Sequence, residues 1–107
     1  MSALTDVSPE EPVLGQMEGF TWSTEESAAY EAAIDAINIA VGAYTALITA
    51  EEAKSAPDPA VIAAARSGRA DCARWREQLN PADHAAVAST RRRFAQLARD
   101  LRRRADE

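Results

Sequence analysis

The most regular pattern of hydrophobic and polar positions lies in residues 23–55, a stretch without a proline. Large apolar side chains recur there at alternating steps of four and three residues, which places them along one line of an α-helix. This seam consists of Tyr30, Ile34, Ile37, Val41, Tyr44 and Ile48. The pattern predicts a long helix over residues 24–54, whose seam the rest of the chain must cover.

Both ends of this predicted helix carry boundary residues. Ser23, followed three residues later by Glu26, has the spacing of a capping box, in which each side chain accepts a hydrogen bond from a backbone N–H of the other residue. The run Ser-Ala-Pro-Asp-Pro at 55–59 ends the helix, because a proline disfavours the helical conformation of the residue before it. The helix is therefore predicted to begin and end sharply.

Two further helices follow. An Asp-Pro pair at 58–59 and an Asn-Pro pair at 80–81 each combine a good N-cap with a proline at the first helical position. These signals predict helices over residues 59–79 and 81–103. Their large apolar residues at helical spacing are Ile62, Trp75, Leu79, Val87, Phe94, Leu97 and Leu101.

Three helices joined by such short connections alternate in direction, so the predicted fold of residues 23–107 is an all-α, three-helix antiparallel (up-down-up) bundle. The alternative is a long helical hairpin that completes its core as a dimer. Residues 1–22 contain two prolines, two glycines and four acidic residues without a sustained period, which predicts a flexible or extended arm. The apolar residues of the arm, Phe20 and Trp22 among them, are expected either to cap the bundle or to dock into a partner groove.

Composition adds limits on class and location. At 107 residues the chain is one domain, and its 6% aromatic content leaves few large side chains for the core. The single cysteine excludes an internal disulfide, and the first residues lack the pattern of a signal peptide. No stretch reaches the roughly 20 uninterrupted apolar residues of a membrane span. The expected location is cytoplasmic, without membrane association.

Charge is unevenly distributed along the chain. Residues 1–60 hold eleven acidic side chains and one lysine, whereas residues 61–107 hold six acidic side chains and eleven arginines. The two parts attract each other, which favours folding back with exposed ion pairs that contribute only ~0–1 kcal/mol each. The alternative use of this asymmetry is a basic face that binds an acidic partner.

No motif for catalysis, metal binding or nucleotide binding is present. Cys72 and His84 are the only candidates for a nucleophile and its base, and reflecting the chain about the turn at Asn80 leaves them roughly 6 Å out of register. One histidine and one cysteine do not provide the ligand spacing of a zinc or di-iron site. We therefore expect no enzyme activity, no cofactor or metal, and no small-molecule substrate.

An alanine-rich face on the first helix is the candidate interaction surface. Ile39 lies about 180° from Tyr30 on the helix, and small residues around it would let another helix approach closely. This predicts a surface for a protein partner or a homodimer, and the alternative is that surface alanines only favour helix formation. The candidate partner-binding residues, with those of the arm, are Phe20, Trp22, Ala32, Ala36, Ile39, Ala43 and Ala46.

Arginines on the last helix support a different function. Arg92, Arg99 and Arg103 share one face at i, i+7 and i+11, where they could follow a phosphate backbone. The sequence pI near 4.9 and the acidic first helix oppose nucleic-acid binding. The primary prediction is a small accessory, antitoxin-like or immunity-like subunit that binds a larger protein, and nucleic-acid binding through the last helix is the alternative.

Overall fold

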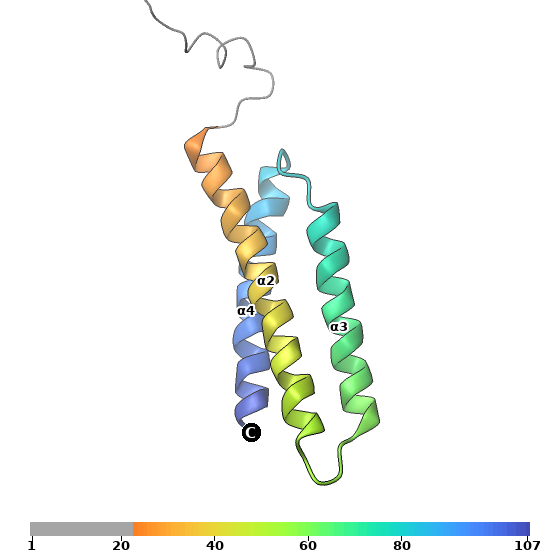
Figure 1. Cartoon of the computed structure of the whole chain (residues 1–107). Helices are drawn as coiled ribbons and strands as arrows, with labels where there is room; N and C mark the ends of the chain where they lie inside the picture. Colours follow the sequence, from red (N-terminus) through yellow and green to blue (C-terminus); the bar gives the residue numbers. More distant parts are fainter. Residues whose placement is uncertain (1–22) are drawn as a thin grey trace, which may run out of the picture.

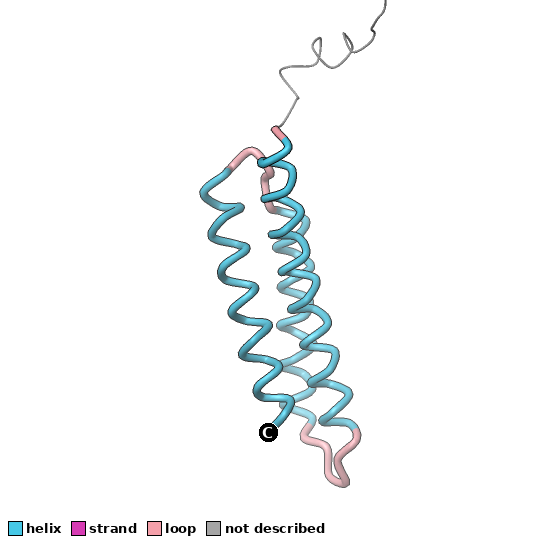
Figure 2. The backbone as a smooth tube through the Cα atoms, turned by 90° about the vertical axis from the view of Figure 1, so that its left-hand side faces the viewer, coloured by secondary structure: helices cyan, strands magenta, loops and turns pink. Residues whose placement is uncertain are grey.

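The computed structural model describes residues 23–107, and this part of the chain is all-α. Its helices are α2 (Thr24–Glu52), α3 (Pro59–Gln78) and α4 (His84–Asp106). Following the colours in Figure 1, α2 and α4 run in the same direction and α3 runs in the opposite one. The two connections lie at opposite ends of the molecule (Figure 2). The all-helical class predicted from the sequence is confirmed. Phe20 and Trp22 lie outside the described residues.

Helix α2 packs against both α3 and α4, and small side chains make much of its buried surface. Ile37 and Ile48 of the predicted seam are buried, whereas Tyr30, Ile34, Val41 and Tyr44 are only half-buried. The buried surface includes four alanines of α2, which are Ala33, Ala36, Ala40 and Ala43. The buried stripe is centred between the two neighbouring helices, because small residues there let both helices approach α2 closely.

Helices α3 and α4 meet through large side chains. The rings of Trp75 and Phe94 are 5.5 Å apart in an edge-to-face arrangement, which is a favourable geometry for an aromatic pair. The indole N–H of Trp75 donates a hydrogen bond of 3.0 Å to the hydroxyl of Thr90, which is buried. The guanidinium of Arg93 lies over the Trp75 ring, 4.5 Å from its centroid. One aromatic side chain thus connects α3 to three residues of α4.

The capping box predicted at Ser23 is present. The backbone N–H of Ser23 donates to Glu26 Oε1 at 2.8 Å, and the backbone N–H of Glu26 donates to Ser23 Oγ at 3.0 Å. Asp58 caps α3 as predicted, since its Oδ1 accepts a hydrogen bond of 2.9 Å from the Ala60 backbone N–H. Local residues therefore set the beginnings of these two helices.

The prediction that the last helix begins at Pro81 is wrong. Asn80 Oδ1 accepts a hydrogen bond of 3.0 Å from the Ala82 backbone N–H, which closes a turn instead of starting a helix. Asp83 is the N-cap, because its Oδ1 accepts a hydrogen bond of 3.0 Å from the Ala86 backbone N–H. The Asn-Pro pair makes the connection, since a side chain bonded to the nearby backbone competes with helix formation.

The expectation that no segment is apolar enough for a membrane span also needs correction. By length and composition alone, α2 could cross a membrane. The same helix supplies buried residues to the bundle, including Ile37 and Ala40, each 0% exposed. The core helix of a helical bundle has this composition too, so the property by itself does not assign a location to the chain.

Candidate interaction surface

A shallow groove runs along the surface where α2 and α4 lie side by side. Its first section begins at Ser23 and shares Ala29 and Ala88 with the middle section. The middle section shares Ala95 with the last section, which extends to Ile39. The three sections are therefore continuous, and we call them the α2/α4 groove. At a rise of 1.5 Å per residue along α2, the groove is roughly 24 Å long.

The floor of the α2/α4 groove is apolar and built from small residues. Ala29 and Ala32 of α2 face Ala88 and Ala95 of α4 across it. Ile39 lies at the far end and is 52% exposed, the only large hydrophobic side chain that is exposed in residues 23–107. An apolar floor with a polar rim is the usual anatomy of a surface that binds another protein segment.

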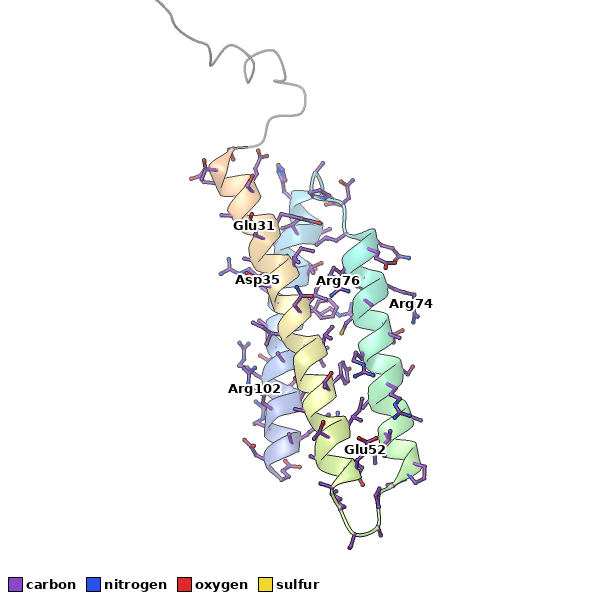
Figure 3. The ribbon with its side chains drawn as sticks, viewed as in Figure 1. Glu31, Asp35, Glu52, Arg74, Arg76 and Arg102 are labelled. Atoms are coloured by element: carbon purple, nitrogen blue, oxygen red, sulfur yellow. The ribbon has the colours of Figure 1, made fainter. Side chains whose placement is uncertain are left out.

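The rim of the groove on α4 is positively charged. It carries Arg91, Arg92, Arg99 and Arg102. Within residues 23–107 no hydrogen bond or ion pair involves Arg91, Arg92 or Arg102, and Arg99 donates a hydrogen bond of 2.7 Å to Gln96 on its own helix. Figure 3 shows Arg102 projecting outward from α4. The rim on α2 is less charged and includes Glu25 and Asp35.

A contact between His84 and Glu26 closes the end of the groove where α2 and α4 begin. His84 Nε2 lies 2.7 Å from Glu26 Oε2, while the other carboxylate oxygen of Glu26 takes part in the capping box. The pKa of Glu26 is lowered from its ordinary value, mainly by the hydrogen bond from the Ser23 backbone and to a smaller extent by His84. This arrangement ties the first turns of the two helices together.

The structure brings together only part of the predicted partner-binding set. Ala32, Ile39, Arg92 and Arg99 line the α2/α4 groove. Ala36 lines the groove too, although it is only 6% exposed, whereas Ala43 is buried in the core with Ala65 and Leu101. Ala46 is exposed but does not line the groove. Arg103 is paired with Asp100.

Arg92 and Arg99 of α4 were predicted for this surface, but the other α4 residues that line it were not. Ala88, Arg91, Ala95, Arg99 and Arg102 all line the groove, and they recur at steps of three or four residues. The signal was therefore present as a mixed stripe of alanine and arginine on the last helix. It was not recognised because only apolar stripes and arginine stripes were considered, each by itself.

The candidate chemical residues lie in different parts of the molecule. Cys72 is 1% exposed in the core beside Phe94, and burial raises the pKa of its thiol. His84 is exposed at the end of the bundle and bound to Glu26. Within the described part of the chain, no group of three or more His, Cys, Asp or Glu could hold a metal ion. Comparisons with family models, with curated proteins and with solved structures give no match.

Proposed function

We propose that this protein is a non-enzymatic interaction module that binds a larger protein partner through the α2/α4 groove. The single observation that carries the proposal is the exposed Ile39, which lies at the end of an alanine floor with arginines along its rim. In this proposal residues 23–107 act as a rigid up-down-up bundle. The module is an accessory subunit, antitoxin-like or immunity-like, that acts in the cytoplasm by covering a surface of its partner.

Physical arguments support the groove as the binding surface. Burying apolar surface stabilises a complex by ~25 cal/mol per Å², and an alanine loses no side-chain entropy when it is covered. The alanine floor therefore contributes contact area at little entropic cost. Arginine is one of the residues that most often anchor protein interfaces, and the rim arginines can pair with acidic groups of a partner.

Affinity capture from the cells that encode the chain tests this proposal. The comparison uses the full chain, Ile39→Arg and a control, Ala70→Arg, whose site is exposed on α3. We expect one protein to be captured by the wild type and the control, and to be lost with Ile39→Arg. Circular dichroism checks that all three variants are folded. Capture that is identical for all three variants, or no specific capture, would refute binding through Ile39.

A homodimer is the alternative occupant of the same surface. Each copy would bring Arg91, Arg92, Arg99 and Arg102 to the interface, against Glu25 and Asp35 on the α2 rim. Charges of the same sign would then meet without enough acidic groups to compensate, which opposes this contact. Light scattering on the purified chain is expected to give the mass of a monomer. A stable dimer that Ile39→Arg dissociates would favour self-association instead.

Nucleic-acid binding remains the second candidate, because Arg91, Arg92 and Arg102 have no partner in the described chain. Arginines along one face of a helix can neutralise successive phosphates, and such binding weakens steeply with added salt. Glu25 and Asp35 on the same groove oppose it. A gel-shift titration with duplex DNA and with RNA separates the two functions. Tight, strongly salt-dependent binding that Arg102→Gln weakens would favour this candidate over the protein partner.

A further inference from the structure

The α2/α4 groove opens where the preceding segment of the chain joins the bundle. Ser23, the first described residue, lines the end of the groove together with Glu26 and His84. Residues 1–22 are therefore attached directly at this groove. We propose that residues 1–22 of the same chain occupy the α2/α4 groove and cover Ile39. This inference goes beyond the proposed function, because it requires no other molecule.

Charge complementarity selects this segment over a second copy of the chain. Residues 1–22 contain four acidic side chains and no lysine, arginine or histidine. The acidic residues are Asp6, Glu10, Glu11 and Glu18. The groove offers four arginines, of which Arg91, Arg92 and Arg102 have no partner within residues 23–107. The segment would add four acidic groups to Glu25 and Asp35 of the α2 rim, whereas a second copy would bring four more arginines.

The apolar residues of the segment complement the floor of the groove. Residues 13–22 include Val13, Leu14, Met17, Phe20 and Trp22. Aromatic side chains bury ~150–250 Å² each, and a floor made of alanines leaves room for such large groups above it. Proline and glycine in this segment disfavour a helix, so we expect it to bind in an extended form.

The reach of the segment matches the length of the groove. An extended chain advances about 3.3 Å per residue, so residues 11–22 would span roughly 40 Å from Ser23, more than the roughly 24 Å of the groove. Met17 would then come level with Ala95, and the segment is long enough for Glu10 and Glu11 to reach Arg102 at the far end with slack to spare. A segment tethered this closely acts at an effective concentration in the millimolar range, so even a weak contact would be populated.

The consequence is a groove covered by its own chain. An external acidic partner would have to displace residues 1–22, and its apparent affinity would equal the intrinsic affinity multiplied by the fraction of chains in which the groove is open. The covered state would also protect Ile39 from water and from nonspecific contacts. Both effects depend on the arginine rim, and high salt should weaken both.

Disulfide trapping in the full-length chain tests the inference without any partner. One variant carries Met17→Cys with Ala95→Cys in the groove, and the matched control carries Met17→Cys with Ala70→Cys, exposed on α3. The native Cys72 stays in place because it is 1% exposed. Under mild oxidation we expect the groove pair to close at least about tenfold faster than the control. Arg99→Glu with Arg102→Glu should remove most of this advantage.

Each outcome of the trapping experiment has a distinct meaning. Equal rates for the two pairs would refute the inference. Disulfides between two chains in place of one within a chain, detected by mass on a non-reducing gel, would also refute it, because residues 1–22 would then bind another copy. Neither result bears on the external partner, which the capture comparison at Ile39 tests separately. Failure of one proposal can therefore be told from failure of the other.

Discussion

The arginines of α3 and those of α4 differ in what they contact. On α3, Arg76 Nη1 donates a hydrogen bond of 2.6 Å to Asn38 Oδ1, Arg69 donates one of 3.1 Å to Thr45 Oγ1, and Arg66 lies 3.5 Å from Glu52. All three links reach α2, and Figure 3 shows Arg76 between the two helices. On α4, the arginines that line the α2/α4 groove make no such link to α2.

The cause of this difference lies on α2. Its side toward α3 carries Asn38, Thr45 and Glu52, whereas its side toward the groove is lined mainly by alanines and Ile39, with Glu25 and Asp35 only at the rim. The α3 arginines therefore find acceptors, and those of α4 face an apolar floor. The comparison teaches that arginine content alone does not identify a binding surface. The attraction predicted between the acidic and basic parts is met on the α3 side by one pair, Arg66 with Glu52, because Asn38 and Thr45 are uncharged.

The largest effect is expected for a charge placed in the core, where α2 packs against both α3 and α4. Ile37 is 0% exposed, so Ile37→Arg should bury an unpaired charge. The cost is comparable to the free energy of unfolding of a typical domain, ~5–15 kcal/mol, so the variant should unfold. Ile39→Arg, at a site 52% exposed, should change the free energy of unfolding by less than about 0.5 kcal/mol. Thermal melting followed by circular dichroism measures both. Equal unfolding of the two variants would show that Ile39 belongs to the core.

The next effect concerns the contact between α3 and α4. Thr90→Val would keep the shape of this side chain but remove the acceptor for the Trp75 indole N–H, at a cost of about 1–2 kcal/mol. Ser89→Ala, at an exposed neighbouring position, should cost less than about 0.5 kcal/mol. Urea denaturation of both variants gives the values. A neutral Thr90→Val would mean that water satisfies the indole equally well.

A smaller effect is expected where α3 approaches α2. A Cβ at Gly68 would lie 2.4 Å from the nearest Tyr44 ring carbon, so Gly68→Ala must push the ring aside and should cost about 1 kcal/mol. At Gly42, a Cβ would meet nothing within 4 Å, and Gly42→Ala should stabilise α2 by about 0.5–1 kcal/mol. Chemical denaturation should show opposite signs. Two stabilising substitutions would contradict the close approach of α3.

Acid titration compares the two ends of α2. The pKa of buried Glu51 is lowered from 4.5 by the hydrogen bond from Lys54 and then by the one from the Asp58 backbone N–H. Such a carboxylate stabilises the folded chain at pH values above its pKa in the unfolded chain. This stabilisation is lost as the pH falls through its lower pKa in the folded chain. Glu51→Gln should therefore lose less stability between about pH 6 and pH 3 than the wild type.

Glu26→Gln is the matched variant at the α4 side of the molecule. The pKa of Glu26 is lowered as well, so both variants should flatten the acid limb of the stability curve. Asp100, whose pKa is lowered mainly by Gln96, leaves a residual slope in each. Melting curves at a series of pH values measure these slopes. An unchanged slope in Glu51→Gln would show that its carboxylate does not stabilise the α2–α3 connection.

The smallest effect bears directly on the arginine comparison. Arg76→Gln should cost about 0.5 kcal/mol by loss of its hydrogen bond to Asn38, whereas Arg102→Gln should leave the stability of the bundle unchanged. A double-mutant cycle with Asn38→Ala isolates the Arg76 contact from the other effects of each substitution. Equal losses for Arg76→Gln and Arg102→Gln would show that the α4 rim also has a structural role.

The sequence alone determined the helices and most of their beginnings, because caps and prolines act within a few residues. Ser23 and Asp58 were identified as N-caps correctly, and the 100° rotation per residue distinguished buried Ile37 from exposed Ile39. The start of α4 was missed because Asn80 and Asp83 are both good caps. Only the competition between a turn and a helix decided between them.

Only the tertiary structure decided which alanines and arginines are accessible. A helical wheel gives the direction of each side chain from its own helix axis, but it does not give the positions of the neighbouring helices. Ala43 and Ala32 illustrate this, since the first is buried in the core with Ala65 and Leu101, while the second remains on the floor of the groove. The α2/α4 groove is a product of two helices lying side by side, so no pattern within either helix could define it.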